Sequence, residues 1–394
     1  MQSQTFFGSD SRMHKQLMEC LPAEGVAVSV ACNRGSSDVP SDSLAALSQV
    51  PGLGLLPIHF GPTLNSQSWL RRGALLGTVP RMLLDGVRLA RFIRRSHVSV
   101  IHGTEKPRDA FYAVLLAQAT GAKAVVHLHV KLTERYSWMA KWAVRHADAV
   151  IGVSPFVAES AVGMGARRAN VFSVVNGLDP KAWDPNLSGR CIRSELGIPA
   201  ADVVFMISAR IFEWKGHREL IQAFAKLHRS RPDSWLLIVG EDDPRAHPGK
   251  RPFTPELKML AKNLGVQDRV IFTGFRQDVA QLLAASDVFA MPTFEEPCAV
   301  AFLEAMAMGL PVIATKSGGT DSMVVDGETG VLVEHGDISA LAHAMETLAA
   351  DPELRASMGW AGRARLLAQL TPTHMARNVA HIYRTICAPW GEPS

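Results

Sequence analysis

Two glutamates eight residues apart, Glu296 and Glu304, are the first residues whose type and spacing could do chemistry. Glu296 follows a short apolar run, VFAMP (288–292), and Glu304 lies about two turns further on, inside a helical pattern of apolar residues. A carboxylate accepts hydrogen bonds from adjacent hydroxyls, so the pair suits a ribose diol or the hydroxyls of a sugar. Because backbone amides at a helix start attract anions, three residues offer further donors: Cys298, Ala299 and Val300.

Two cations follow another apolar run in a similar way. Arg210 comes just after VVFMIS (203–208), Lys215 lies five residues further, and an amphipathic segment (217–230) begins after Gly216. Two cations at a helix start suit a diphosphate, and the alternative is a pair of surface cations on a loop. The sequence contains neither G-x-x-x-x-G-K-[ST] nor G-x-G-x-x-G, which disfavours a P-loop and a nicotinamide-dependent reaction.

A third candidate is His129, at the end of the apolar run AVVHLHV (124–130), with His127 two residues earlier. Alternation along a strand places both side chains on one face. A histidine at such a place could hydrogen-bond a sugar or transfer a proton. The alternative is a histidine that is simply packed or exposed.

Secondary-structure elements must position these residues, and the sequence predicts two series of strands. Short Val/Ile-rich runs separated by helix-length segments predict parallel sheets buried on both faces. The first series is 26–32, 98–102, 124–130, 149–154 and 171–175, and the second is 203–208, 235–240, 269–274, 288–292 and 311–315. Helices are predicted between them, for example over 217–230 and 338–350. The predicted fold is α/β, with two doubly wound, Rossmann-like domains facing a central cleft, where such folds bind ligands.

The domain boundary is predicted within 176–190, a stretch rich in Asn, Asp, Pro and Gly. We therefore expect an N-terminal domain over 1–185 and a C-terminal domain over 186–373. The last helical stretch, about 374–390, could pack back on the first domain.

Composition is that of a globular protein. Of 394 residues, 47% are hydrophobic and 20% charged, and the formal net charge is +4. The five cysteines lack C-x-x-C spacing, which disfavours a disulfide framework or a zinc cluster and fits a reducing cytoplasm. The N-terminus lacks an apolar secretory core, and no long apolar run could span a bilayer.

The first half of the chain is basic, with 20 Lys+Arg and 13 Asp+Glu in residues 1–187. Segment 68–98 alone holds seven Arg and one acid, Asp85, with apolar residues at helical spacing: Leu83, Val87, Phe92 and Ile93. Two interpretations stay open. The segment is either a core-packing helix with a solvated basic face or a peripheral contact with a membrane surface or anionic acceptor.

Taken together, these residues resemble the retaining glycosyltransferases of family 4, which have the GT-B fold. Five stretches lie in the family's order: AVVHLHV, DAVIGVSPFVAES with VVNGLDPKAWDP, ARIFEWKG, EEPCAVAFLEAMAMGLPV and SGGTDSMVVDGETGVLV. Glu296 and Glu304 match the two glutamates of the Glu-x7-Glu signature. Arg210 and Lys215 match the phosphate-binding cations, and His129 matches the sugar-contacting histidine.

The resemblance implies a role for each position. Arg210 and Lys215 would neutralise the donor diphosphate, Glu304 would bind the ribose, and Glu296 and His129 would contact the transferred sugar. It further implies donor binding at Gly8, Gly240, Phe275 and Arg276 and at the helix start, Cys298–Val300. No cofactor or metal is expected, and the chain has no Asp-x-Asp. The expected partners are a nucleotide-sugar donor, with UDP-sugar favoured over GDP-mannose, and a sugar, glycolipid or small-molecule acceptor, and not nucleic acid.

The chain also departs from the family. Family members usually begin with a strand before the glycine-rich loop, whereas here only six residues precede Phe7, so we expect a short or missing first strand. This departure keeps one alternative open, a catalytically inactive nucleotide-sugar-binding protein or partner subunit. A phosphorylase or a sugar-nucleotide epimerase fits the motifs less well. The expected location is the cytoplasm, free or on the inner face of the membrane.

Overall fold

The computed structural model describes residues 1, 3, 7–35, 41–60, 72–104, 106–242 and 251–388, with only the backbone described for residues 9 and 72–79. The chain divides into two compact units. The N-terminal unit consists of Met1–Asn176 together with Pro372–Ser394, and the C-terminal unit is Gly177–Thr371. The division falls before the expected boundary at 185, because the intervening residues bond within the C-terminal unit. The amide of Leu178 donates to the carbonyl of Leu370 over 2.9 Å.

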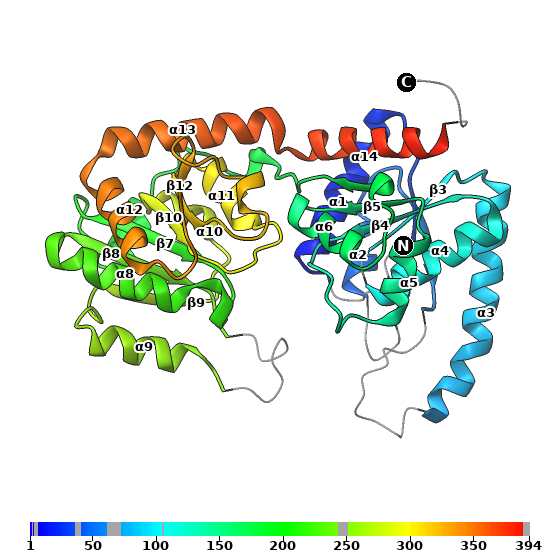
Figure 1. The fold of residues 1–394 in the computed structure, drawn as a ribbon, viewed down its shortest axis with the longest axis horizontal. Coiled ribbons are helices and arrows are strands. Elements are labelled where there is room, and N and C mark those ends of the chain that lie inside the picture. The colour runs from blue at the N-terminus through cyan, green and yellow to red at the C-terminus, as the bar shows by residue number, and fades with distance from the viewer. Residues whose placement is uncertain are drawn as a thin grey trace. The chain divides into compact units, whose positions relative to one another are not determined.

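The C-terminal unit is built on one six-stranded parallel sheet, in the order β12-β11-β10-β7-β8-β9 (Figure 1). Its strands are β7 (Val203–Ser208), β8 (Ser234–Val239), β9 (Val270–Gly274), β10 (Val288–Met291), β11 (Val312–Thr315) and β12 (Gly330–Val333). Its helices are α7 (Arg190–Glu195), α8 (His217–Ser230), α9 (Thr254–Asn263), α10 (Val279–Ala284), α11 (Val300–Ala307), α12 (Ile338–Ala350) and α13 (Pro352–Gln369).

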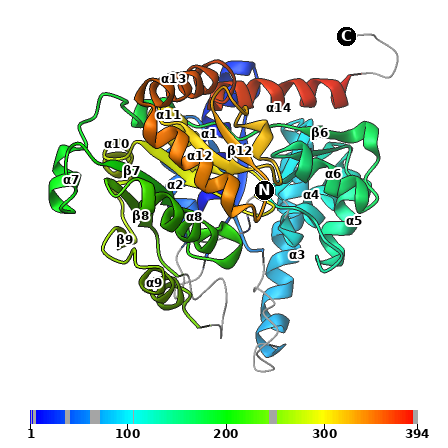
Figure 2. The same cartoon turned by 60° about the vertical axis from the view of Figure 1, so that its left-hand side comes forward.

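Helices cover both faces of this sheet. Right-handed crossovers place α8 and α9 on one face and α11 on the other, because the strand order reverses at β7. Helix α8 contacts both α9 and α12, and α11 packs against α13 (Figures 1 and 2). Four phenylalanines are fully buried between these layers: Phe205, Phe224, Phe289 and Phe302. Most residues of these strands are buried, which explains their continuous apolar runs, whereas β9 is buried only at Val270.

The N-terminal unit contains two parallel sheets, β1-β2 and β3-β4-β5-β6. Its strands are β1 (Ser29–Asn33), β2 (Gly54–Ile58), β3 (Val100–Thr104), β4 (Lys123–Leu128), β5 (Ala149–Gly152) and β6 (Val171–Ser173). Its helices are α1 (Ser9–Cys20), α2 (Asp42–Leu47), α3 (Arg72–Arg95), α4 (Pro107–Thr120), α5 (Trp138–His146), α6 (Pro155–Gly163) and α14 (Pro372–Cys387). The fold is thus α/β with two Rossmann-like units, as expected.

The C-terminal helix α14 belongs to the N-terminal unit and packs against α1 (Figures 1 and 2). Met375, Val379 and Ile382 of α14 share one core with Leu17 and with strand residues of the sheet. Their spacing of four and three residues is the helical period that puts apolar side chains on one face.

A cavity of about 610 Å³ lies beside β1 and β3, lined in part by Gly25–Ala31 and Ser96–His102. The described N-terminal residues reach this region, since the Met1 ammonium donates to the carbonyl of His102 over 2.6 Å. Among the residues described, no strand precedes β1, while residues 2 and 4–6 lie outside them.

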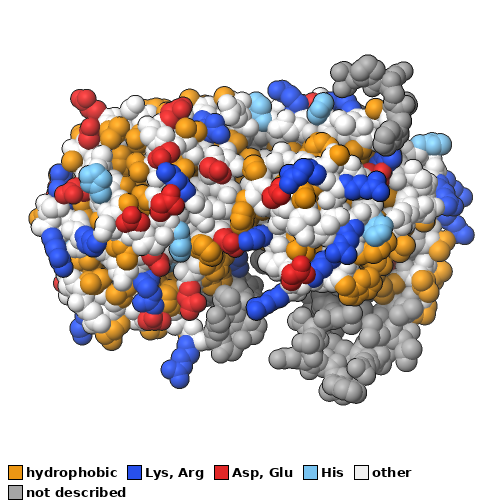
Figure 3. All heavy atoms as spheres, viewed as in Figure 1, with side chains coloured by type: hydrophobic (Ala, Val, Ile, Leu, Met, Phe, Trp, Pro, Cys, Tyr) orange, Lys and Arg blue, Asp and Glu red, His pale blue; other side chains and the backbone are white. Residues whose placement is uncertain are grey.

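Helix α3 buries only part of its predicted apolar face. Leu89 and Ile93 are buried, whereas Leu83 and Val87 are 66% and 48% exposed. Blue and orange side chains lie next to one another at the right-hand edge of Figure 3, where Figure 1 places α3. No helix in the described ranges is both long and apolar enough to span a bilayer.

Candidate functional site

The candidate site of the C-terminal unit lies where the order of its sheet reverses. From β7 the chain proceeds outwards to β8 and β9, then returns to the other side of β7 with β10. Ligands of doubly wound folds bind outside the carboxyl ends of the strands at such a switch point. The segments that follow β7 and β10 carry Arg210, Lys215 and Glu296, and the structure brings the last two together.

Lys215 and Glu296 form a buried ion pair. The Lys215 ammonium donates to Oε2 of Glu296 over 2.5 Å, and the two side chains are only 13% and 7% exposed. The Thr293 hydroxyl lies 3.3 Å from the same carboxylate oxygen. The ammonium also lies 4.1 Å from the centre of the Trp214 ring, which adds a cation–π contact. Neither Thr293 nor Trp214 is among the predicted site residues.

Backbone geometry brings Lys215 to this place. Gly216 ends the short 3₁₀ turn Glu213–Lys215 with a φ of 79°, and a Cβ here would collide with the carbonyl of Pro292 after β10. Glycine therefore allows the loop after β7 to press against the loop after β10. Helix α8 begins directly after it with His217, and burial lowers the pKa of His217 to about 4.

Glu296 is held from the other side by the loop after β11. The amide of Gly319 donates to the carbonyl of Glu296 over 2.7 Å, and the amide of Glu295 donates to the Ser317 hydroxyl over 2.6 Å. Gly318, with a φ of 67°, packs against the backbone of both glutamates, and Glu295 itself has a φ of 49°. The loop containing Gly318 therefore fixes a strained turn that points Glu296 at Lys215.

The remaining predicted residues of this edge are Arg210, Glu304 and the start of α11. Arg210 is exposed, and its guanidinium lies 5.1 Å from the centre of the Phe212 ring. Glu304 is half-buried within α11. The helix start expected from the sequence is present, with Ala299 as the N-cap and Val300 as the first helical residue, and Cys298 precedes them.

The other donor-binding positions expected in the C-terminal unit differ in their exposure and in their contacts. Gly240 and Gly274 line a cavity of about 540 Å³, and a Cβ on Gly240 would collide with the backbone of Ala209. Phe275 is 65% exposed. The Arg276 guanidinium is already engaged, because it donates to Asp278 over 2.7 Å and to Glu195 over 2.6 Å.

The predicted residues of the N-terminal unit lie at the ends of α1 and β4. Gly8 is the N-cap of α1, and His129 follows β4 and is buried. The rings of His127 and His129 stack with centres 4.7 Å apart, so both side chains lie on one face as expected. Nε2 of His129 lies 2.7 Å from Nε2 of His14, a contact that the sequence did not predict.

Comparison with known proteins identifies the class of protein to which this fold belongs, the glycosyltransferases. The family "Glycosyl transferases group 1" matches residues 190–365, and "Glycosyl transferase 4-like domain" matches residues 11–177. The chain therefore belongs to the group 1 glycosyltransferases and has the GT-B fold.

The chain is also similar to individual glycosyltransferases and to a solved structure. The chain is 33% identical over 231 residues to the lipopolysaccharide core biosynthesis glycosyltransferase LpsE of Rhizobium meliloti, covering 58% of this chain and 61% of LpsE. It is 33% identical over 269 residues to the GDP-mannose-dependent alpha-(1-6)-phosphatidylinositol monomannoside mannosyltransferase of Mycolicibacterium smegmatis, covering 63% and 66%. The structure of Anabaena Alr3699/HepE in complex with UDP is similar in fold, with a TM-score of 0.78, 21% identity and 98% of both chains covered.

Proposed function

We propose that this chain is a retaining, metal-independent glycosyltransferase that uses a nucleotide-diphosphate sugar. A UDP-sugar is favoured as the donor, with GDP-mannose as the alternative. The acceptor is a hydroxyl of a sugar, a glycolipid or a small natural product. The observation that carries the proposal is the buried Lys215–Glu296 pair at the switch point of a group 1 glycosyltransferase fold.

The pair suggests how donor charge and sugar hydroxyls are recognised together. Lys215 and Arg210 face a developing diphosphate charge, and fixed cations in a partly dehydrated site stabilise such a leaving group strongly. Glu296, once its partner turns to the phosphate, accepts hydrogen bonds from the sugar. Glu304 holds the ribose, and His129 of the N-terminal unit contacts the sugar.

The proposed transfer balances without a further reactant. The bond from the anomeric carbon to the diphosphate oxygen breaks, and a bond to the acceptor oxygen forms on the same face. Bond formation on that face gives retention, and the departing phosphate oxygen takes the acceptor's proton. Because Arg210 and Lys215 supply the positive charge, no metal ion is assigned to this step.

The names of the relatives support both donor and acceptor classes. HepE binds UDP, whereas the mycobacterial mannosyltransferase uses GDP-mannose. LpsE acts in lipopolysaccharide core biosynthesis, and the mannosyltransferase acts on a phosphatidylinositol mannoside, so both are connected with lipid-linked glycans. A glycolipid is therefore the acceptor class that we test first.

The first experiment measures thermal stability with UDP, GDP, ADP and dTDP and their sugars. A nucleotide at about 100 times its dissociation constant adds about 2.7 kcal/mol to the free energy of unfolding. We expect one base to raise the melting temperature. Transfer with that donor is then followed by NMR of the anomeric proton, which reports retention directly. The measurement is repeated after chelation of metal ions.

The variant Lys215→Met should lose both the shift and the transfer. Lys226→Met is the matched control, since Lys226 lies near the C-terminal end of α8, the helix that follows Lys215, and bonds only to Ser339 in the contacts described. Nucleotide binding with neither transfer nor slow donor hydrolysis would favour the inactive binder. An inverted anomer would contradict the proposed mechanism, as would activity that is lost with the chelator and restored by Mg²⁺ or Mn²⁺.

We also propose that α3 contacts a membrane surface, which would place the enzyme peripherally on the cytoplasmic face. Three neighbouring apolar side chains, Leu83, Leu84 and Val87, are 66%, 60% and 48% exposed. The same helix carries five exposed arginines: Arg81, Arg88, Arg91, Arg94 and Arg95. Apolar side chains rimmed by cations are typical of helices that lie in the interface of an anionic bilayer.

Co-sedimentation with vesicles tests this contact. We expect binding to vesicles that contain phosphatidylglycerol and loss of binding in the Leu83→Ser/Leu84→Ser/Val87→Ser variant. Met259→Ser, at a 56% exposed methionine on α9, serves as the control. Equal sedimentation of both variants, or none with the unaltered protein, would remove α3 as a membrane contact.

A further inference from the structure

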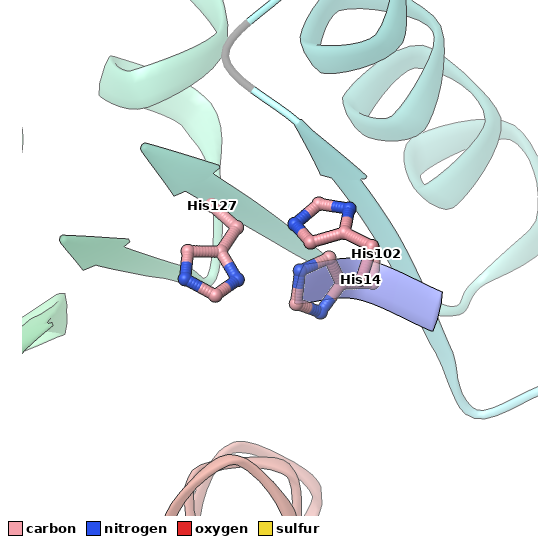
Figure 4. A group of neighbouring side chains, drawn as sticks. All are labelled: His14, His102 and His127. Carbon is pink, nitrogen blue, oxygen red and sulfur yellow. The ribbon is translucent and has the colours of Figure 1, made fainter. Parts of the chain in front are cut away.

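A cluster of buried histidines lies inside the N-terminal unit. His14 comes from α1, His102 from β3 and His127 from β4, and one ligand atom from each lies within 4.8 Å of the other two. Figure 4 shows one nitrogen of each ring turned towards the other two rings. The three segments are far apart in the sequence, so their spacing gave no metal motif.

Several nitrogens of this cluster have no hydrogen-bond partner among the described residues. They are Nε2 of His102 and both ring nitrogens of His127, and the His127 side chain is fully buried. Buried polar atoms are nearly always paired, because an unpaired one loses its bond to water without replacement. A metal ion that accepts the lone pair of His102 Nε2 and of one His127 nitrogen would pair two of these three atoms.

A neighbouring tyrosine orients one of the rings. Nδ1 of His102 lies 2.6 Å from the hydroxyl of Tyr383 on α14. When Nδ1–H donates to this oxygen, Nε2 keeps its lone pair directed into the cluster. Metal-bound histidines almost always have such a partner on the second ring nitrogen.

We propose that His14, His102 and His127 bind one Zn²⁺ ion. Zinc–nitrogen bonds of about 2.0–2.1 Å place tetrahedral ligand nitrogens about 3.4 Å apart, so the rings need to close by little more than about 1 Å. His14 and His102 also line the cavity of about 610 Å³, which gives the fourth position room for water or an anion. Three neutral imidazoles and one exchangeable ligand are a common zinc set.

This site goes beyond the proposed transfer reaction, which assigns no metal to the donor. Zinc would link α1 to β3 and β4 within the N-terminal unit. It would also change the contacts of His129, because Nε2 of His129 lies 2.7 Å from Nε2 of His14. A zinc ion bound to Nε2 of His14 would replace this His14–His129 contact.

The test begins with protein dialysed against a chelator and then titrated with Zn²⁺ or Co²⁺. We expect one ion per chain by elemental analysis, a higher melting temperature with zinc, and the visible absorption of tetrahedral Co²⁺. His14→Gln should weaken zinc affinity at least about 100-fold, since losing a ligand costs no less than losing its outer partner. Tyr383→Phe, which keeps the ring in place, should weaken it about 10–100-fold.

His217→Gln is the matched control, because His217 is as fully buried as His127 and belongs to the C-terminal unit. It should bind zinc as the unaltered protein does. Circular dichroism of each metal-free variant establishes that it is folded before titration. Absence of stoichiometric zinc binding to the unaltered protein would overturn the site, as would unchanged affinity in folded His14→Gln and Tyr383→Phe.

Discussion

Replacing Lys215 with methionine leaves the Glu296 carboxylate buried without its cation. Both side chains are almost fully buried, at 13% and 7% exposure, so solvent screens the loss only weakly. Removing one partner of a buried pair costs about 3–5 kcal/mol, because the remaining charge is uncompensated. For a unit of roughly 200 residues, 1 kcal/mol corresponds to about 2–4 °C, so we expect the melting temperature to fall by about 6–20 °C.

A second substitution separates stability from catalysis. In Lys215→Met/Glu296→Gln the buried charge is gone, so most of the lost free energy of unfolding should return. Turnover should stay at least about tenfold below that of the unaltered enzyme, because the diphosphate still lacks its cation. Calorimetry measures the first quantity, and release of nucleotide diphosphate in the presence of acceptor measures the second.

Two results would refute this reasoning. If Lys215→Met melted as the unaltered protein does, the ion pair would not be the buried contact described. If the double variant recovered turnover together with stability, Lys215 would serve the fold alone and would not act on the diphosphate.

Three further predictions concern single residues. Glu304→Ala should weaken nucleotide affinity in calorimetric titration, and unchanged affinity would exclude the ribose contact. Gly318→Ala should lower turnover about tenfold or more, because its Cβ would displace the backbone of Glu296, whereas Gly327→Ala, with a φ of 77° and open space around it, should not. His217, with a pKa of about 4 in the fold and 6.5 as its ordinary value, takes up a proton only on unfolding between these values. The free energy of unfolding should therefore fall by up to about 3 kcal/mol from pH 6.5 to pH 4, and a denaturant series should show a shallower fall in His217→Gln.

Much of the fold could be predicted from apolar runs alone. Helices over 217–230 and 338–350 and the strand over 203–208 begin and end where predicted, because these segments are buried and strongly periodic. Strand β2 was not predicted. It contains Gly54 and Pro57, residues that are uncommon inside strands, and it is an only half-buried edge strand.

Part of the candidate site could also be predicted from the sequence. Polar residues that follow strands are visible in a sequence, which is why Lys215 and Glu296 could be proposed. Their direct pairing was not predicted, because it depends on β7 and β10 being neighbours although β8 and β9 lie between them in the chain. The role of Gly318 was not predicted either. Gly318 packs against the backbone of Glu296, which is 22 residues earlier in the sequence, so the sequence does not show that the two are in contact.

The position of α14 has a consequence for how the protein is made. The core shared by Leu17 and Met375 joins the first helix of the chain to the last. The C-terminal unit is continuous and can fold as soon as it leaves the ribosome, whereas the N-terminal unit waits for its final helix. At about 5–20 residues per second, the roughly 200 residues in between take about 10–40 s. Throughout that interval the core of the N-terminal unit lacks α14, and Leu17 lacks the α14 side chains that pack with it.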